Sequence, residues 1–421
     1  MNSLRLRVTG CLCSSLVIAL AAAAQGAARP DIAPQLQAGE LAAAEKMLAE
    51  HLAAEPKDDL ARFQLGTVQF VQAAERLAQD GSRYGAGSPV FLRLPFVRLG
   101  GLAGRNDTPE PVTYANARAM LERFQASILV AESTLAPIQD KNLAWKLDLR
   151  DVRLDLNGDG ERTDTETLGA LFQMVAVRPR WDTQSQPPLD LVVGFDSADT
   201  VWLRGYCHLL AALSDMILAY DEERLFDLTA HAVFVNAQTE FAKRRDLDMS
   251  VEPERFNSWD EIQDVIALVH LINFDLKDPA RMKSAHAHLL RVIELSRENW
   301  KLILAETDND HEWIPGPTQQ SVIPNLAFNQ EQVAGWQRFL DEAEAILRGQ
   351  KLVPFWRNGF KEGVNLRRVF LEPRPFDLVL WVQGTAAFPY LETGEQTSPE
   401  TWRQFQQLFR GEFVGVVAWV N

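Results

Sequence analysis

The chain has 421 residues, of which 57 are Asp or Glu and 42 are Lys or Arg, so its formal net charge at pH 7 is −15. The acids are spread along the whole chain, and a surface of this kind repels nucleic acid and anionic lipid. We therefore expect no nucleic-acid partner. A chain of this length can bury a sizeable core, divided into two or three structural units.

Residues 1–28 have the pattern of a secretory signal peptide. Two arginines precede an apolar run, Cys11–Ala24, and small residues follow it. The run is shorter than the roughly 20 apolar residues that a membrane-spanning helix needs, and no later stretch reaches that length. We therefore expect no membrane span and an exported protein, periplasmic or secreted, whose mature chain begins between Gln25 and Asp31.

Export would also remove two of the three cysteines, Cys11 and Cys13, and leave Cys207 as the single thiol of the mature chain. One cysteine forms no internal disulfide, so we expect the fold to depend on its core and on a bound metal. Cys207 lies among apolar residues of a predicted helix, which predicts a buried and unreactive thiol.

Residues 29–80 are predicted to form a helix pair, because apolar residues recur at helical spacing on both sides of a break at Pro56. Six residues fall at characteristic separations: Gly39, Ala44, Leu48, Pro56, Leu65 and Gly66. The small ones let two helices approach closely, and the proline ends the second helix. Over residues 33–72 the sequence resembles a tetratricopeptide repeat. A lone repeat must pack on the rest of the chain, since at least about three are needed to bury a continuous core. An ordinary antiparallel helix pair would show the same pattern.

Residues 81–111 are rich in Gly and Pro and predict a long loop. This loop is either a lid or partner-binding segment or an ordered crossover on the helical body. Residues 112–350 predict that body. From their apolar stripes and capping residues, its helices are expected at 114–137, 167–175, 199–220, from Ser258 onward, 278–304 and 329–349.

Residues 351–421 are predicted to form a small α+β part. Segments rich in β-branched and aromatic residues, at 365–370, 376–382 and 413–420, are typical of short strands, and a helix is expected at 399–409. Within the helical body, the alternation of Leu143, Trp145, Leu147 and Leu149 predicts a further strand that joins this β element, with a bulge where the alternation shifts. The sequence therefore predicts a mainly α fold with a small β element, α+β overall.

The clearest motif is the stretch from Asp155 to Glu166, in which oxygen-bearing side chains alternate and Gly160 allows a sharp bend. The stretch resembles an EF-hand calcium loop. The resemblance implies six calcium ligands: Asp155, Asn157, Asp159, the backbone carbonyl of Glu161, Thr163 and Glu166. Without calcium, the same residues would form an Asp-rich surface turn.

Two features set this stretch apart from a paired sensor hand. Arg162 stands where EF-hands usually carry an aliphatic residue that contacts a second hand, and a predicted strand precedes the loop where a helix is usual. No second loop follows from the sequence, because His311 stands where Asp308-Asn309-Asp310 would need a glycine. We therefore expect one structural calcium site at a turn from a strand to a helix.

One candidate for catalysis is the set Arg204, His208 and Asp215 on the predicted helix 199–220. Their spacing places all three on one narrow stripe, where a cation, a base and an acid could transfer protons. The alternative is that the stripe is the exposed edge of the helix, since charged groups are mostly exposed.

A second candidate is the acidic run Glu306–Glu312, which is followed by Trp313. Paired carboxylates beside an aromatic side chain suit glycoside hydrolysis, whereas the alternative is a solvated acidic loop. His286 and His288 lie about 200° apart on a helix and so do not bind one metal ion together.

These patterns favour an exported helical binding or scaffold protein that carries one structural calcium ion and binds a protein or an extended ligand on its helical surface. The alternative is an exported hydrolase of glycans or similar polymers, which uses either the 306–312 run or the Arg204, His208 and Asp215 stripe. The sequence indicates neither the partner nor the oligomeric state.

Overall fold

A computed structural model of the chain describes residues 28–86, 106–176, 190–240, 258–323, 326–357, 359 and 361–408. Nearly all of the predicted signal peptide, most of the predicted loop 81–111 and the predicted strand 413–420 lie outside these residues. Within them, no helix is both long enough and apolar enough to cross a membrane. The described part is mainly helical with a few small antiparallel sheets, which confirms the predicted fold class.

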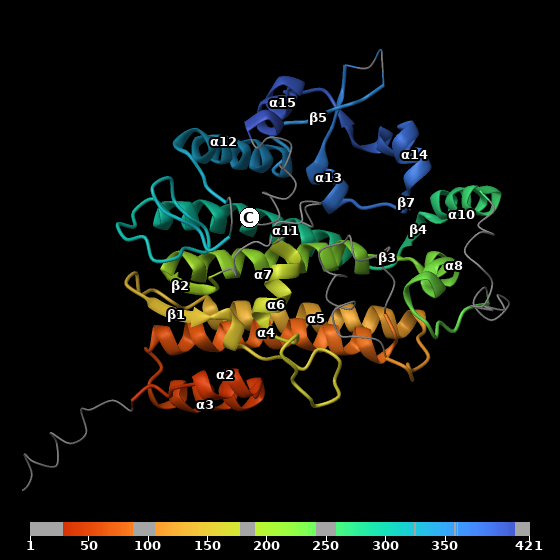
Figure 1. Ribbon diagram of the computed structural model, residues 1–421. Coiled ribbons are helices and arrows are strands. Elements are labelled where there is room, and N and C mark those ends of the chain that lie inside the picture. The colour runs from red at the N-terminus through yellow and green to blue at the C-terminus, as the bar shows by residue number, and fades with distance from the viewer. Residues whose placement is uncertain are drawn as a thin grey trace, which may run out of the picture.

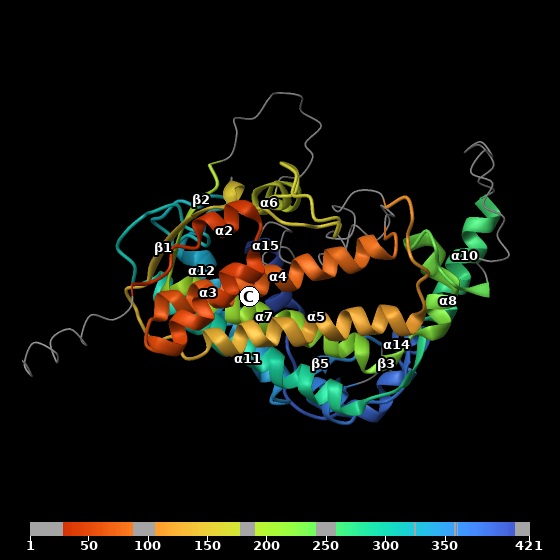
Figure 2. The same ribbon diagram turned by 90° about the horizontal axis from the view of Figure 1, so that it is seen from below.

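Long helices stack in layers through the middle of the molecule (Figure 1). They are α4 (Asp59–Arg83), α5 (Tyr114–Leu135), α7 (Ser197–Leu218), α11 (Pro279–Ile303) and α12 (Gln330–Leu347). α4 packs on α5, α5 on α7, α7 on α11 and α11 on α12. Figure 2 shows α4, α5, α7 and α11 from below, running side by side. α7 is therefore covered by neighbouring helices on both sides.

Capping side chains begin several of these helices, among them the predicted caps Asp278 and Asn329. Thr113 and Asn329 each form a capping box with the residue three positions later, and Asp278 accepts a hydrogen bond from the Ala280 N–H at 2.9 Å. Such side chains satisfy N–H groups that have no partner in the first turn of a helix. The expected helix starts at Tyr114, 278 and 329 are thereby confirmed to within one residue.

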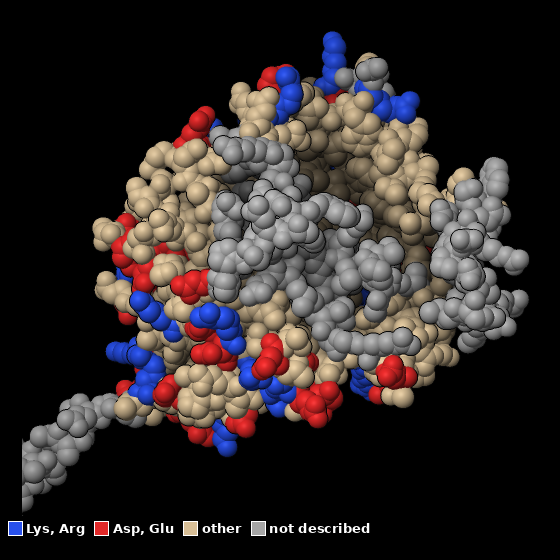
Figure 3. All heavy atoms as spheres, in the orientation of Figure 1, with Lys and Arg blue, Asp and Glu red and all other residues tan. Residues whose placement is uncertain are grey.

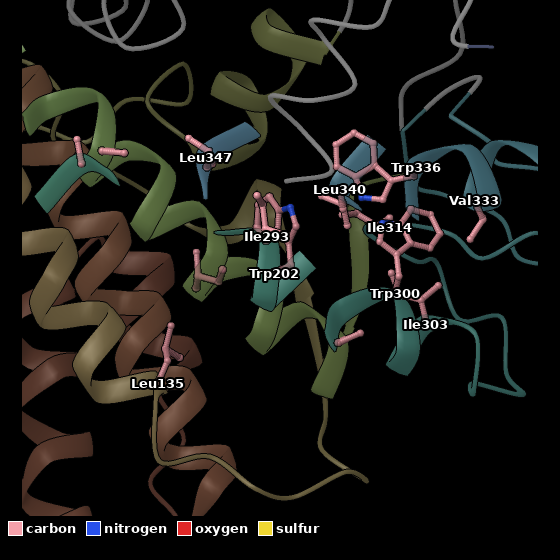
Figure 4. Packing of buried hydrophobic residues seen from close by; sticks show 14 of the residues in the cluster. Leu135, Trp202, Ile293, Trp300, Ile303, Ile314, Val333, Trp336, Leu340 and Leu347 are labelled. Carbon is pink, nitrogen blue, oxygen red and sulfur yellow. The ribbon is translucent and has the colours of Figure 1, made fainter. Parts of the chain in front are cut away.

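The main hydrophobic core lies between α7, α11 and α12 (Figure 4). Trp300 and Trp336 are among its largest fully enclosed side chains, and the indole N–H of Trp336 donates to Ser296 Oγ at 3.0 Å. The apolar stripe predicted for the 278–304 helix faces this core, with Met282 and Ala285 buried. Burying a side chain of the size of Met282 stabilises the fold by about 1.5 to 3 kcal/mol.

The N-terminal helices form a second core. α2 (Ala33–Ala38) packs on α3 (Leu41–Ala54), and α3 packs on α4. Their buried side chains contact Leu154 and Leu156, which lie at the start of the predicted calcium loop. The helix pair expected within residues 29–80 is present, and its resemblance to a tetratricopeptide repeat remains a prediction.

The predicted strand at Trp145 is present as β1 (Ala144–Asp148) and pairs antiparallel with β2 (Val192–Asp196), with Trp145 opposite Phe195. The expectation that it joins the C-terminal β element is wrong. The predicted bulge is wrong as well, because the alternation shifts at a 3₁₀ turn, Leu149–Asp151. The chain then runs through the predicted metal loop into α6 (Leu168–Ala176).

The remaining elements are mostly short. One sheet has the order β3 (Tyr220–Asp221), β4 (Asn273–Leu276) and β7 (Phe376–Asp377), and another has the order β5 (Val353–Pro354), β6 (Gly363–Val364) and β8 (Leu391–Glu392). The helices around them are α8 (Glu223–Val233), α10 (Ser258–Leu271), α13 (Leu366–Leu371), α14 (Leu378–Gln383), a 3₁₀ helix (Thr385–Tyr390) and α15 (Pro399–Leu408). The helix expected at 399–409 is thus confirmed.

Two predicted C-terminal strands are wrong in whole or in large part. Residues 366–371 form α13, and only the first two residues of the segment 376–382 form a strand before α14 begins. In both places a capping side chain starts a helix. Asn365 accepts from the Arg368 N–H, and Asp377 accepts from the Leu380 N–H. Local capping therefore outweighs the β propensity of these short segments.

Candidate functional site

The backbone of the predicted calcium loop bends at two glycines. Gly158 and Gly160 have φ angles of 77° and 83°, in the left-handed region that residues with a Cβ rarely adopt. The carboxylate of Asp155 accepts hydrogen bonds from the N–H groups of both glycines, at 2.8 and 3.1 Å. The first predicted ligand is therefore a buried carboxylate enclosed by the turn of its own loop.

Glu166, the last predicted ligand, closes the loop from its other end and is 5% exposed. Its Oε1 accepts from the Leu156 N–H at 3.1 Å, and its Oε2 accepts from the N–H and hydroxyl of Thr163 at 3.1 and 2.9 Å. Asp155 and Glu166 are thus two buried carboxylates held by donors of the loop itself. Within the described residues, neither is bonded to an Arg or Lys side chain.

Three more predicted ligands, Asn157, Asp159 and Glu161, lie in the middle of the loop. The Asn157 amide donates to Asp159 Oδ2 at 2.7 Å, and the exposed Glu161, a predicted ligand through its carbonyl, donates its N–H to Asp159 Oδ1 at 2.7 Å. The carboxylates of Asp155, Asp159 and Glu166 do not form a described trio with ligand atoms within 4.8 Å of one another. Because calcium–oxygen distances are about 2.3 to 2.6 Å, binding would require the exposed Asp159 side chain to rotate toward the buried pair.

The loop is attached to the N-terminal helices by polar contacts. Arg162, at the place where a paired EF-hand contacts its partner, donates from Nε to the Gly39 carbonyl at 3.0 Å. Gln79 on α4 donates to the Asp155 carbonyl at 2.7 Å, and Glu75 on the same helix accepts from the Asp155 N–H at 2.8 Å. Burial raises the pKa of Glu75. Polar contacts therefore attach the loop to α4 and to Gly39, between α2 and α3.

A separate acidic cluster lies where α7 begins and α11 has ended. Asp196, Glu306 and Glu312 bring one carboxylate oxygen each within 4.8 Å of one another, and no other Asp, Glu, His or Cys trio among the described residues does so. Asp196 caps α7 by accepting from the Ala198 N–H, and Glu312 accepts from the Asp310 N–H at 2.9 Å. Three carboxylates at this separation are a donor set for a hard divalent cation.

Burial and mutual repulsion change the protonation of this cluster. Desolvation, followed by the charge of Asp196, raises the pKa of Glu306 to about 8. Burial also raises the pKa of Glu312 and of Asp196, and it raises the pKa of the fully enclosed Asp199 well above its usual range. Near neutral pH the cluster therefore holds protons that the same carboxylates would release in water.

The structure brings together only part of the predicted run 306–312. Glu306 and Glu312 join the cluster, whereas Asp310 forms an exposed ion pair with Lys146 at 2.7 Å, and Asp308 contributes its charge to the cluster. Sequence reasoning missed Asp196 and Asp199. The spacing of these two acids was a detectable signal, because an Asp three residues before another Asp forms a capping box at the start of α7.

The predicted stripe of Arg204, His208 and Asp215 does not form the exposed edge of α7, so that expectation is wrong. The side chains of Arg204 and His208 are 11% and 13% exposed, and Asp215 is buried. The reason is that α5 and α11 cover α7 from two sides. The three residues contact different partners: Arg204 lies 3.2 Å from Glu132 on α5, and Asp215 lies 3.0 Å from Arg281 on α11.

The two histidines of the 286–288 segment are separated, as predicted. His286 lies within hydrogen-bond distance of the Leu347 carbonyl, at 2.7 Å, whereas His288 contacts His208 on α7. Cys207 is completely buried, as predicted, and burial raises the pKa of its thiol. His208 is therefore not part of the acidic cluster, because its contacts are with Glu132 and His288.

An apolar cavity of 390 Å³ lies elsewhere, between α4, α5, α7 and α8. Its walls are mainly apolar and include Ala117, Leu121 and Phe226. At one place the wall is polar, where Arg118 lies 3.3 Å from Glu222 and the Tyr114 hydroxyl donates to Glu222 at 2.9 Å. Cavities of this size and character are typical of sites for apolar groups.

Neither protein-family models nor curated proteins and solved structures give a match to this chain.

Proposed function

We propose that the protein is an exported, periplasmic or secreted, helical binding protein whose loop 155–166 holds one structural calcium ion. The observation that carries the proposal is the pair of buried carboxylates, Asp155 and Glu166, at the two ends of the loop. Burying two like charges in one short loop is unfavourable, and a divalent cation between them removes this cost.

The donor set suits calcium better than a softer metal. Its predicted members are carboxylate, amide, carbonyl and hydroxyl oxygens, and calcium takes six to eight such ligands. The loop has no second hand to hold it in the binding conformation, so the expected dissociation constant is on the order of 10⁻⁴ to 10⁻³ M, the range of extracellular modules. Such a site fills outside the cell and stays mostly empty in the cytosol.

Calcium would act through the contacts of the loop with α3 and α4. Arg162 and Gln79 connect the loop to Gly39 and to the α4 helix, and Leu154 and Leu156 pack in the N-terminal core. Fixing the loop therefore also fixes the N-terminal helices on the body. We assign the calcium ion this structural role.

The binding role is supported by the apolar cavity and by the exposed apolar surface of α14. Val379, Leu380 and Val382 on α14 are 48%, 45% and 70% exposed. In Figure 3 the face near α13 and α14 carries few charged side chains, whereas acidic and basic side chains are mixed over its lower part. Apolar surface of this kind marks sites where a partner or an extended ligand binds.

Thermal unfolding with calcium and with a chelator tests the proposal. At about 1 mM calcium, the expected affinity range corresponds to a stabilisation of about 0.4 to 1.4 kcal/mol for the parent. Glu166→Gln should lose this stabilisation. Glu161→Gln is the matched control, because it removes the same charge from the same loop while Glu161 is a predicted ligand only through its carbonyl. An unchanged melting temperature of the parent, with no calcium binding by calorimetry up to tens of millimolar, would contradict the proposal.

A second candidate function, hydrolysis of a glycan or similar polymer, is favoured by the acidic cluster. Glu306, with its pKa raised to about 8, lies beside Asp196, so a protonated carboxyl and an ionisable one are adjacent. Such hydrolysis uses one protonated carboxyl group as acid and one ionised carboxylate as base or nucleophile. Hydrolysis of soluble polysaccharides by the parent, lost in Glu306→Gln and kept in the exposed Glu331→Gln, would support this function. Equal activity of the parent and Glu306→Gln would exclude the cluster as its site.

A further inference from the structure

Two histidines from different helices face each other in the middle of the helical body. Nδ1 of His208 on α7 lies 2.7 Å from Nδ1 of His288 on α11, and the ring planes are inclined by 41°. The side chains are 13% and 16% exposed, so a small ion reaches them without unfolding of the protein. Their own helices hold both rings, because α7 and α11 pack closely along their lengths.

A carboxylate lies behind each imidazole. Glu132 Oε1 is 3.4 Å from Nε2 of His208, and Asp215 Oδ2 is 3.9 Å from Nε2 of His288. Asp215 is 3% exposed, and within the described residues its Oδ2 has no hydrogen-bond partner. A carboxylate at one ring nitrogen keeps the proton there and leaves the other nitrogen as a free ligand, which is the arrangement found behind most metal-bound histidines.

No assignment of the ring hydrogens in two neutral imidazoles gives every polar group of this arrangement a partner. If both Nε2 atoms carry the hydrogens that face Glu132 and Asp215, both Nδ1 atoms carry lone pairs that point at each other across 2.7 Å. If one Nδ1 carries the hydrogen of a neutral ring, the Nε2 of that ring turns a lone pair toward a carboxylate. A hydrogen bond from His288 Nδ1–H to His208 Nδ1 avoids both close contacts, but it leaves the buried Oδ2 of Asp215 without a facing donor. A cation bound by both Nδ1 atoms would let both Nε2 atoms keep their hydrogens toward the two carboxylates.

The charged neighbours do not supply that cation. Arg204 lies 3.2 Å from Glu132, and Arg281 lies 3.0 Å from Asp215 and 3.6 Å from Glu122, so the described arginines are engaged with the acids around the histidines. A neutral imidazole is the form that binds a metal ion.

We propose that His208 and His288 bind a transition-metal ion of the zinc class through their Nδ1 atoms, with Glu132 and Asp215 as positioning residues and water at the remaining coordination places. Imidazole nitrogen suits zinc, copper and nickel, whereas calcium and magnesium prefer oxygen. Zinc–nitrogen distances of about 2.0 to 2.1 Å at a tetrahedral angle place two ligand nitrogens about 3.3 Å apart. The rings therefore separate by about 0.6 Å on binding, a shift that small side-chain torsions supply.

The site is independent of the proposed calcium loop. It uses different helices, different donor atoms and a different class of metal, so each site has variants that leave the other intact. It also ties α5, α7 and α11 together, since Glu132, His208 and His288 come one from each. A bound ion would therefore cross-link the central layers of the body.

The test is calorimetric titration of the full chain, without an affinity tag, with zinc chloride. We expect one zinc ion per chain and a dissociation constant at least about tenfold weaker in His288→Asn and His208→Asn, with a loss of roughly 10 to 100-fold in Glu132→Gln. The exposed His270→Asn is the control for non-specific histidine binding and should match the parent. Glu166→Gln should also match it, whether or not the loop binds calcium.

Visible absorption of the parent with cobalt(II) adds a readout that does not depend on any variant. Ligand-field bands of a nitrogen-bound cobalt ion, displaced by zinc, are the expected result. No zinc binding by the parent, or equal affinity of the parent and a His288→Asn variant with a native circular dichroism spectrum, would overturn the proposal. So would imidazolium signals for both rings in nuclear magnetic resonance spectra near neutral pH that zinc leaves unchanged, because the pair then holds only protons.

Discussion

The proposed calcium loop, residues 155–166, and the acidic cluster both concentrate carboxylates, but they stabilise them in different ways. In the loop, Asp155 and Glu166 accept hydrogen bonds from N–H groups of residues close in sequence. In the cluster, Asp196 comes from the start of α7, whereas Glu306 and Glu312 come from the segment after α11. The first set is local, and the second is assembled by the packing of α7 on α11.

The two sets also differ in their hydrogen-bond donors. In the loop, Asp155 and Glu166 each accept hydrogen bonds from two backbone N–H groups. The cluster has fewer such donors, and burial with mutual repulsion raises the pKa of Glu306, Glu312 and Asp199. The cluster carboxylates therefore keep their protons to a higher pH than free carboxyl groups do.

The largest expected effect on stability comes from removing the buried carboxylate of Glu166 at the end of the loop. Glu166→Ala, measured in chelator, should lower the free energy of unfolding by about 3 kcal/mol, because it leaves the buried N–H group of Leu156 and the N–H and hydroxyl groups of Thr163 without their acceptor. Urea unfolding measures the change. Glu161→Ala, an exposed acid of the same loop, should change it by less than about 0.5 kcal/mol. A loss below about 1 kcal/mol in Glu166→Ala would mean that the loop is not held by this side chain.

A smaller effect with a defined pH dependence is expected from the cluster. The folded pKa of Glu306, about 8, is above its unfolded value, so the folded state binds the proton more tightly and stability falls as pH rises from about 5 to 8. Glu306→Gln, measured in chelator, should remove part of this slope and raise the free energy of unfolding at pH 8 by about 1 to 2 kcal/mol, after discounting for partial exposure.

The control for this experiment is Glu331→Gln on α12, an exposed acid whose removal should leave the slope of the parent unchanged. Urea unfolding at several pH values compares the three proteins. Parallel stability curves for the parent and Glu306→Gln would show that the cluster does not store protons, and the contrast with the loop would then disappear.

The smallest expected effect concerns the contact between the loop and the N-terminal helices. Arg162→Ala removes the hydrogen bond to the Gly39 carbonyl and should cost about 1 kcal/mol. Hydrogen exchange should show faster opening of α2 and α3 while α7 and α11 remain protected. Uniform acceleration in all helices would instead indicate that the N-terminal helices do not open as a separate unit.

The sequence by itself determined the features that depend on neighbours along the chain. The helices around Tyr114, 199–220, 278–304 and 329–347 follow from apolar stripes and capping side chains, and the bend at Gly160 follows from its glycine. The buried Cys207 follows from the apolar residues around it. Each depends on interactions within a few residues, and these can be inferred from spacing alone.

Only the tertiary structure decided which distant residues meet. Spacing placed Arg204, His208 and Asp215 on one stripe, but whether that stripe faced water depended on α5 and α11, which cover it. Likewise, the pairing of β1 with β2, the meeting of Asp196 with Glu306 and the contact of His208 with His288 join segments about 50 to 110 residues apart. Such contacts arise from the burial of apolar surface between layers. A periodic apolar pattern predicts that one face of a helix will be buried, but it does not predict which element will cover that face.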